Sequence, residues 1–200
     1  MNGWTNTALL LCDLQNDFLD PAGAYGRAGQ AAPEIAALPA RLRPLRDALR
    51  AAGGVVIATQ FTLVPGRGGE PMIAPHLKKI RPFLGKGDFA PGSWGNATVD
   101  GLQPVDVAVE KVAYSAFYMS RLEWVIRKLG VTRLLVAGIV TNGGVASTFR
   151  DAHVRDLDAI LLEDGCAAFT PETHRIAVDA LRPVGRVASI AEMIAEINAG

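Results

Sequence analysis

Three kinds of chemically useful residue stand near the ends of separate apolar runs. Asp13 lies near the end of ALLLCDL, Lys111 follows VDVAVE, and Gly143-Gly144 follow RLLVAGIVTN. An aspartate beside a lysine in an apolar cleft can give or take a proton, because the ammonium favours the carboxylate while burial opposes charge on both groups. Backbone N–H groups after the glycines would suit a developing oxyanion or a substrate carboxylate. The glycines would equally suit a tight turn without any chemical role.

These residues can meet only if the apolar runs are strands of one sheet. The runs that predict strands are Ala8–Leu14, Val55–Thr59, Val105–Val109, Arg133–Ala137, Ala159–Leu162 and Arg186–Ser189. Helical spacing predicts helices over Ile35–Leu49, Ser120–Leu129, Asn142–Val154 and Pro171–Leu181 and from Ile190 onward. Pro39 and Pro44 predict a kink or a late start in the first helix. The Gly- and Pro-rich segment Phe61–Thr98 predicts a long loop.

Strands that alternate with helices and are apolar throughout indicate a parallel sheet covered on both faces. The fold class is therefore α/β, with three α/β/α layers and a Rossmann-like, mainly parallel sheet of six strands. We expect one domain over residues 1–200. Ligands of such sheets bind beyond the carboxyl ends of the strands, where the residues named above converge.

Composition excludes several classes of partner. Lys and Arg number 20, as do Asp and Glu, so no basic surplus favours nucleic acid or anionic lipid. Mean hydropathy is +0.21, but no apolar run approaches the roughly 20 residues of a membrane helix. The first residues lack the basic region of a signal peptide. We expect a cytoplasmic enzyme that acts on a small-molecule substrate, because two cysteines cannot form a disulfide framework.

Four segments, in order, resemble the isochorismatase-like hydrolases, a superfamily that includes cysteine hydrolases such as nicotinamidases and carbamoyl-amide amidases. They are LLLCDLQNDF (9–18), EKVAYSAFYMSRLE (110–123), GIVTNGGVASTFRDA (138–152) and EDGCAAFTPETH (163–174). The resemblance implies that Asp13 is the catalytic acid/base and Lys111 the catalytic lysine. It places a non-proline cis peptide at Val140-Thr141. It also makes Gly144 the position of the amidase branch's nucleophilic cysteine.

Glycine cannot form a thioester, so the chemistry at residue 144 must differ from that of the amidases. Cys12 is expected on the opposite sheet face from Asp13, and Cys166 is expected to be a structural thiol rather than a replacement nucleophile. The isochorismatase branch carries Gly or Ser at this position. We therefore expect vinyl-ether hydrolysis, in which protonated Asp13 donates to the vinyl carbon, water adds and pyruvate is released. An amide or carbamoyl hydrolase that has lost its cysteine, or a non-catalytic binder, are the alternatives.

The same resemblance and the loop composition supply candidates for substrate contact. Lys111 would also hold a substrate carboxylate, and the Gly143 and Gly144 amides would bind the other polar end. The remaining candidates are Gln60, Arg67 (for a carboxylate), Tyr114, Phe117, Val140, Thr141, Trp94 and Phe18. The three histidines are scattered, so we expect no metal and no cofactor. The resemblance also implies a homodimer or homotetramer.

Overall fold

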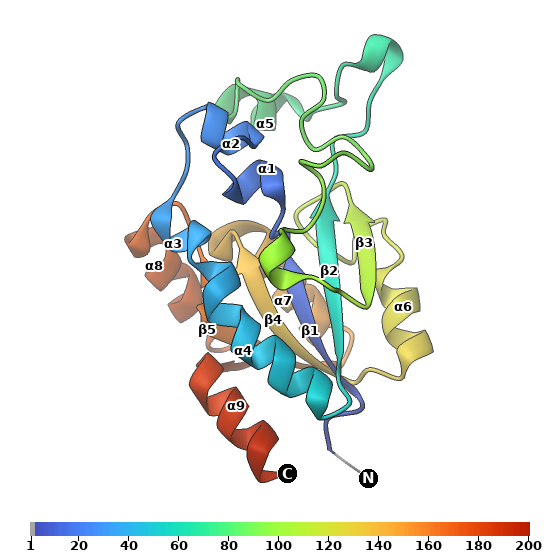
Figure 1. Ribbon diagram of the computed structural model, residues 1–200, viewed down its shortest axis with the longest axis vertical. Coiled ribbons are helices and arrows are strands. Elements are labelled where there is room, and N and C mark those ends of the chain that lie inside the picture. The colour runs from blue at the N-terminus through green and yellow to red at the C-terminus, as the bar shows by residue number, and fades with distance from the viewer. Residues whose placement is uncertain (1–2) are drawn as a thin grey trace.

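The computed structural model describes residues 3–200 and is built on a parallel sheet (Figure 1). Its strands are β1 (Thr7–Cys12), β2 (Val55–Phe61), β3 (Val107–Lys111), β4 (Arg133–Ile139), β5 (Asp158–Ala167) and β6 (Arg186–Ala188). Their order is β3-β2-β1-β4-β5-β6, and each adjacent pair is parallel. This confirms the predicted α/β fold with a six-stranded sheet. The order reverses between β1 and β4, and open parallel sheets bind ligands at such a reversal.

Helices cover both faces of the sheet and bury its alternating side chains. Helices α4 (Leu38–Ala51) and α9 (Ile190–Ala199) cover one face, and α6 (Leu122–Leu129), α7 (Ala146–His153) and α8 (Pro171–Leu181) cover the other. Leu9 and Leu11 of β1 pack on the α4 side, whereas Leu10 packs on the α6 side, as the two-residue repeat of a strand requires. Pro39 lies in the first turn of α4, and Pro44 lies inside the helix without ending it.

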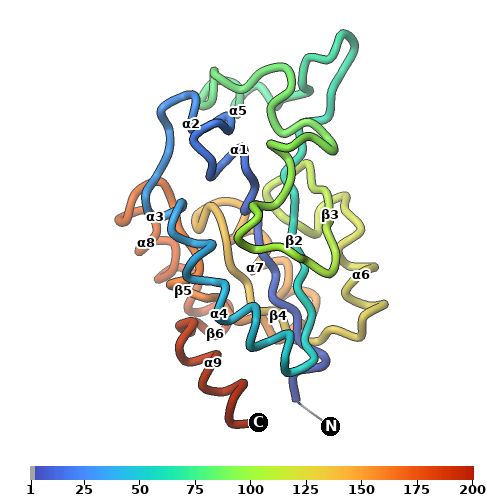
Figure 2. The backbone as a smooth tube through the Cα atoms, viewed as in Figure 1, coloured from blue at the N-terminus to red at the C-terminus, as the bar shows by residue number. Residues whose placement is uncertain are grey.

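A cap of short segments lies beyond the carboxyl ends of β1 and β2 (Figure 1). It contains α1 (Asn16–Leu19), α2 (Ala24–Arg27), α5 (Pro75–Ile80) and the turn η1 (Arg67–Gly69), while α3 (Pro33–Ala36) leads into α4 and η2 (Asp100–Leu102) precedes β3. The predicted loop Phe61–Thr98 thus contains a helix. β1 begins and α9 ends at the opposite end of the molecule (Figure 2). Among residues 3–200, no helix combines the length and the apolar character that spanning a bilayer requires.

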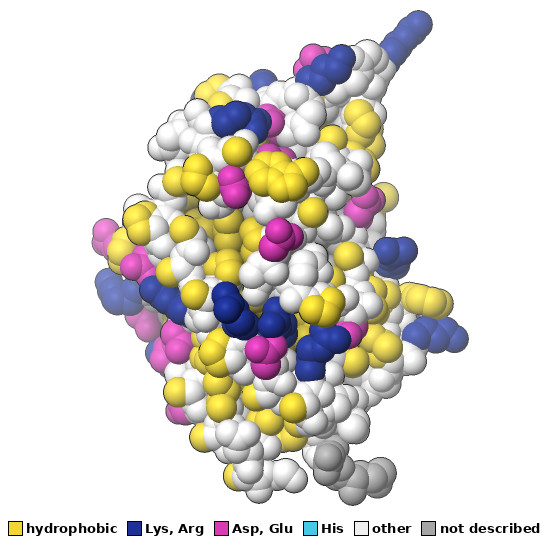
Figure 3. Space-filling view, viewed as in Figure 1, with side chains coloured by type: hydrophobic (Ala, Val, Ile, Leu, Met, Phe, Trp, Pro, Cys, Tyr) yellow, Lys and Arg dark blue, Asp and Glu magenta, His cyan; other side chains and the backbone are white. Residues whose placement is uncertain are grey.

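The cap has its own apolar cluster and a buried carboxylate that ties its two segments together. Tyr25, Leu84 and Phe89 are buried in this cluster, and Phe18 packs against it. The Asp17 carboxylate accepts hydrogen bonds from the backbone N–H of Ala24 at 2.9 Å and of Phe89 at 2.6 Å. These contacts hold the 61–98 segment over the end of β1. On the face seen in Figure 3, acidic and basic side chains are interspersed.

Candidate active site

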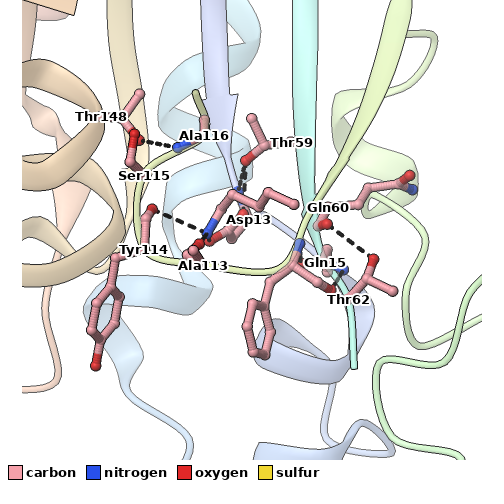
Figure 4. Close-up of polar contacts among 12 residues, drawn as sticks. Asp13, Gln15, Thr59, Gln60, Thr62, Ala113, Tyr114, Ser115, Ala116 and Thr148 are labelled. Atoms are coloured by element: carbon pink, nitrogen blue, oxygen red, sulfur yellow. Dashed lines mark hydrogen bonds and ion pairs between the residues drawn. The ribbon is translucent and has the colours of Figure 1, made fainter. Parts of the chain in front are cut away.

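Asp13 and Lys111 form a buried ion pair at the reversal point of the sheet. Asp13 follows β1 with a φ of 57°, and its Oδ2 lies 2.7 Å from Lys111 Nζ. Its Oδ1 accepts a 2.7 Å hydrogen bond from Thr59 Oγ1, and Figure 4 shows Asp13 between Thr59 and the Ala113-Tyr114 turn. Lys111 ends β3, two strand spacings (about 10 Å) from β1. Only a long side chain can cross β2 to reach the carboxylate.

All three hydrogen-bond donors of the Lys111 ammonium are occupied within the chain. Besides Asp13, it donates to the carbonyl oxygens of Ala113 at 2.9 Å and Tyr114 at 3.3 Å. Figure 4 shows the phenol ring of Tyr114 directed away from Asp13. A lysine ammonium has three N–H groups, so none is left for a substrate carboxylate. Lys111 therefore orients and neutralises Asp13. This differs from the sequence-based expectation that Lys111 also holds a substrate carboxylate.

Burial raises the pKa of the Asp13 carboxyl above its ordinary value, because the charged form loses its water shell. The Lys111 ammonium opposes this most strongly, and the Thr59 hydrogen bond also lowers the pKa. A carboxyl group whose pKa is brought toward neutrality is an effective general acid or base.

The segment after β4 brings a backbone turn against this carboxylate. Gly138 has a φ of 116°, and a Cβ there would lie 2.2 Å from the Cys12 carbonyl oxygen, so only glycine fits. The non-proline cis bond joins Ile139 and Val140, one residue before the predicted position, because β4 extends to Ile139 and the turn starts there. A Cβ at Gly144 would lie 3.4 Å from Asp13 Oδ2. The side of Gly144 on which another residue would carry its side chain therefore faces Asp13 Oδ2.

Asp13, Lys111 and Gly144 line one cavity of about 100 Å³. The predicted contact residues Phe18, Tyr114 and Val140 line it too. The rest of its wall is mostly apolar and consists of Tyr25, Phe61, Leu77, Ile80, Arg81, Leu84, Ile139 and Phe169. An apolar cavity with a few polar groups in its wall is typical of a site for a small molecule.

Other predicted contact residues lie away from this cavity. Gln60 lines a separate open groove and donates to the Asn96 carbonyl at 3.2 Å. It points away because Thr59, its neighbour on β2, takes the side that faces Asp13. Arg67 is exposed in η1, and Trp94 is 54% exposed.

Phe117, Thr141 and Gly143 are occupied by internal contacts. Phe117 is buried on the α6 side of the sheet, where the Arg155 guanidinium lies 4.6 Å from its ring centroid. Thr141 is fully buried, and its Oγ1 lies 2.8 Å from His174 Nδ1. The Gly143 N–H donates to the Val140 carbonyl at 2.9 Å. The Gly143 amide is therefore already satisfied and does not match its expected role toward a substrate.

Comparison with known proteins identifies the family to which this chain belongs. The family model described as the isochorismatase domain matches residues 7–192. The chain belongs to the isochorismatase family. It is 36% identical over 184 residues to the ureidoacrylate amidohydrolase RutB of Methylobacterium radiotolerans, covering 86% of this chain and 71% of the relative. The enzyme of the same name from Pantoea ananatis is 33% identical over 177 residues, covering 83% and 71%.

A solved structure of similar fold is a cysteine hydrolase from Pseudomonas syringae pv. phaseolicola 1448A. It has a TM-score of 0.84 and 27% identity, covering 98% of this chain and 94% of that one. This isochorismatase-family chain is accordingly a hydrolase. The curated relatives are named amidohydrolases, so the predicted isochorismate-type vinyl-ether hydrolysis is not supported. The alternative of C–N hydrolysis fits these relatives better.

Neither cysteine of this family member lines the cavity. Cys12 packs on the α6 side of the sheet, and burial raises its pKa to about 12. Cys166 is buried with its Sγ 3.7 Å from the Val136 carbonyl, and burial raises its pKa well above the ordinary value. Neither thiol ionises at neutral pH, as a nucleophile would need to. Within residues 3–200 no three His, Cys, Asp or Glu side chains are grouped to hold a metal, and the absence of a cofactor stays a prediction.

Sequence reasoning missed Thr59, Tyr25, Arg81 and Phe169. Thr59 could have been found from the sequence. Successive side chains of a strand point to opposite faces, so only one of Thr59 and Gln60 can lie on the same side as Asp13. Tyr25 and Arg81 come from the cap, and Phe169 follows β5. Two short helices without long apolar periodicity supply the cap residues, so no local pattern marks them as neighbours.

Proposed function

We propose that this protein hydrolyses the C–N bond of a small amide or ureido compound, with water as the nucleophile and Asp13 as the general base. The observation that carries the proposal is the approach of Gly144 to Asp13 Oδ2, at 3.4 Å from the position of a Cβ. In the amidase branch that the sequence resembles, a cysteine stands at this position. The amidohydrolase names of the relatives support the same bond type.

In the proposed reaction, Asp13 carries one proton from the attacking water to the departing nitrogen. Asp13 Oδ2 takes a proton from water, and the water oxygen forms a bond to the substrate carbonyl carbon. The protonated Asp13 then gives that proton to the departing nitrogen as the C–N bond breaks. The products are an acid and an amine or ammonia, and Asp13 is again a carboxylate. Lys111 stabilises the carboxylate at the start and end of the cycle, and Thr59 fixes its orientation.

Direct attack by water distinguishes this scheme from that of a cysteine hydrolase. Glycine offers no side chain for an acyl intermediate, and the two thiols of this chain are buried outside the cavity. Water that enters beside Gly144 would meet Asp13 Oδ2 on one side and the substrate carbonyl on the other. A positioned general base of this kind contributes about 10²- to 10⁴-fold to a rate.

The test is a panel of small amides and ureido compounds with ammonia release as the readout. We expect turnover in the parent protein and a loss of at least about 100-fold in Asp13→Asn. Gly144→Cys should add a burst of acyl-enzyme and sensitivity to iodoacetamide, both absent in the parent, because the new thiol lies beside the Asp13–Lys111 pair. No ammonia release above the Asp13→Asn level on the whole panel would refute the proposal. Tight ligand binding without turnover would favour a binding protein. The homodimer or homotetramer remains a prediction of the family resemblance, and the cytoplasmic location remains a prediction from the sequence composition.

A further inference from the structure

The wall of the cavity contributed by the cap carries a second cation. Arg81 directly follows α5, and Tyr25 lies in α2, and both helices belong to the cap (Figure 1). The Arg81 guanidinium carbon lies 5.1 Å from the ring centroid of Phe169 and 5.8 Å from that of Tyr25. These two rings stack at 5.5 Å with an interplanar angle of 9°. An arginine is thus held in place by aromatic faces within the same cavity as Asp13.

This arginine has donors to spare and no acidic partner. Its Nε donates to the Tyr25 hydroxyl at 3.2 Å, and its Nη1 donates to the Ile80 carbonyl at 2.9 Å. A guanidinium has five N–H groups, so donors remain for a ligand. Among residues 3–200, no carboxylate lies within ion-pair distance of Arg81. The Lys111 ammonium is saturated, so Arg81 is the cation of this cavity that can take an anion.

The Tyr25 hydroxyl adds a second donor at the same place. It accepts the hydrogen bond from Arg81, and within residues 3–200 its own hydrogen has no acceptor. Burial raises the pKa of Tyr25, which the neighbouring Arg81 only partly offsets, so the phenol keeps its proton at neutral pH. An arginine fork and a phenol donor that converge in an apolar wall suit a carboxylate, which accepts several hydrogen bonds at once.

We propose that Arg81 and Tyr25 bind a carboxylate of the substrate at the end remote from the bond that is cleaved. The substrate class is then a small amido or ureido acid whose carbon segment lies against Phe18, Phe61 and Phe169, between the carboxylate and the carbonyl at Asp13. This inference rests on the proposed function for the position of the reacting carbonyl. The carboxylate subsite itself rests only on the cap residues, and it moves the anion-binding role from Arg67 and Lys111 to Arg81.

The test compares matched acids and neutral amides in an Arg81→Gln variant. With 3-ureidopropionate and 3-ureidopropanamide as substrates, we expect kcat/KM to fall about 10- to 100-fold for the acid, the loss typical of a charge-assisted hydrogen bond. The value for the amide should change by less than about 3-fold. Tyr25→Phe should lower the acid value in the same direction by a smaller factor. Arg43→Gln, which removes an exposed arginine from α4, is the matched control and should change neither.

A binding measurement separates this inference from the proposed function. Crotonate contains no ureido group and serves as a ligand that cannot be hydrolysed. Calorimetry should show that its affinity falls about 10- to 100-fold in Arg81→Gln, whereas the affinity for crotonamide, the neutral control, should not change. Suppose that crotonate binding depends on Arg81 but no amide or ureido compound of the panel is hydrolysed. This outcome would refute the proposed function and leave the subsite standing. Turnover with no preference for the acid over the amide would refute the subsite and leave the proposed function standing.

Two further outcomes would overturn the subsite. An equal loss for acid and amide in Arg81→Gln would mean that Arg81 only packs the cap. A selective loss of the acid in Arg67→Gln would return the role to Arg67. If Arg81→Gln fails to fold, Arg81→Lys serves in its place. It keeps the charge but loses the fork geometry, and it should lower the acid value alone.

Discussion

Removal of the Lys111 ammonium gives the sharpest test of the buried pair. Asp13 and Lys111 side chains are 6% and 2% exposed, and their charged atoms are 2.7 Å apart. At an effective dielectric constant of about 20, Coulomb's law gives an attraction of about 6 kcal/mol at this distance. Much of it offsets the loss of water around both ions. Lys111→Met leaves the Asp13 charge buried and alone, which typically costs about 3–5 kcal/mol in the free energy of unfolding.

The loss of stability in Lys111→Met should depend on pH, because protonation of Asp13 removes the buried charge that destabilises the folded state. Without Lys111, the cause that most lowers its pKa is gone, and burial raises the folded-state pKa further above the unfolded value. The folded variant then binds more protons than the unfolded chain, so its stability falls as pH rises from about 4 through the raised pKa. The stability deficit relative to the parent should therefore be larger near pH 8 than near pH 5.

Urea unfolding at the two pH values measures this difference directly. Lys79→Met removes an exposed lysine and should change stability by less than about 0.5 kcal/mol at either pH. The double variant Asp13→Asn/Lys111→Met carries no buried charge and should be more stable than Lys111→Met near pH 8. An equal deficit at both pH values would refute the reasoning, because Asp13 would then not carry the penalty.

Three further expectations follow from the same geometry. Thr59→Val removes a hydrogen bond that lowers the pKa of Asp13, so the acid limb of kcat/KM should move to higher pH. An unmoved limb would exclude Asp13 as the base. Gly138→Ala places a Cβ against the Cys12 carbonyl at positive φ, and thermal unfolding should show a loss above about 3 kcal/mol. Iodoacetamide should label neither Cys12 nor Cys166 in the native protein near pH 8, and mass spectrometry of a rapidly labelled thiol would contradict their burial.

Local pattern was sufficient for the strands and for the position of Asp13 at the end of one of them. The run ALLLCDL must be buried on both faces because it has no polar side, and Asp13 is the acid at its end. Helix α8 runs from Pro171 to Leu181, as its helical spacing predicted. These features depend on periods of two and 3.6 residues, which a single segment carries within itself.

The cavity wall depended on the tertiary structure. Arg67 and Arg81 lie in the same Gly- and Pro-rich segment, and nothing local separates a solvated arginine from one that lines the cavity. The segment's course is set by distant contacts, such as the Asp17 carboxylate that holds the Phe89 amide. Likewise, the sequence supplied a lysine near an aspartate, but only the fold brought two backbone carbonyls to its remaining donors. The sequence thus determined which chemical groups reach the rim of the sheet, because strand ends are local. The tertiary structure decided which of them are free to meet a substrate, because that depends on partners far away along the chain.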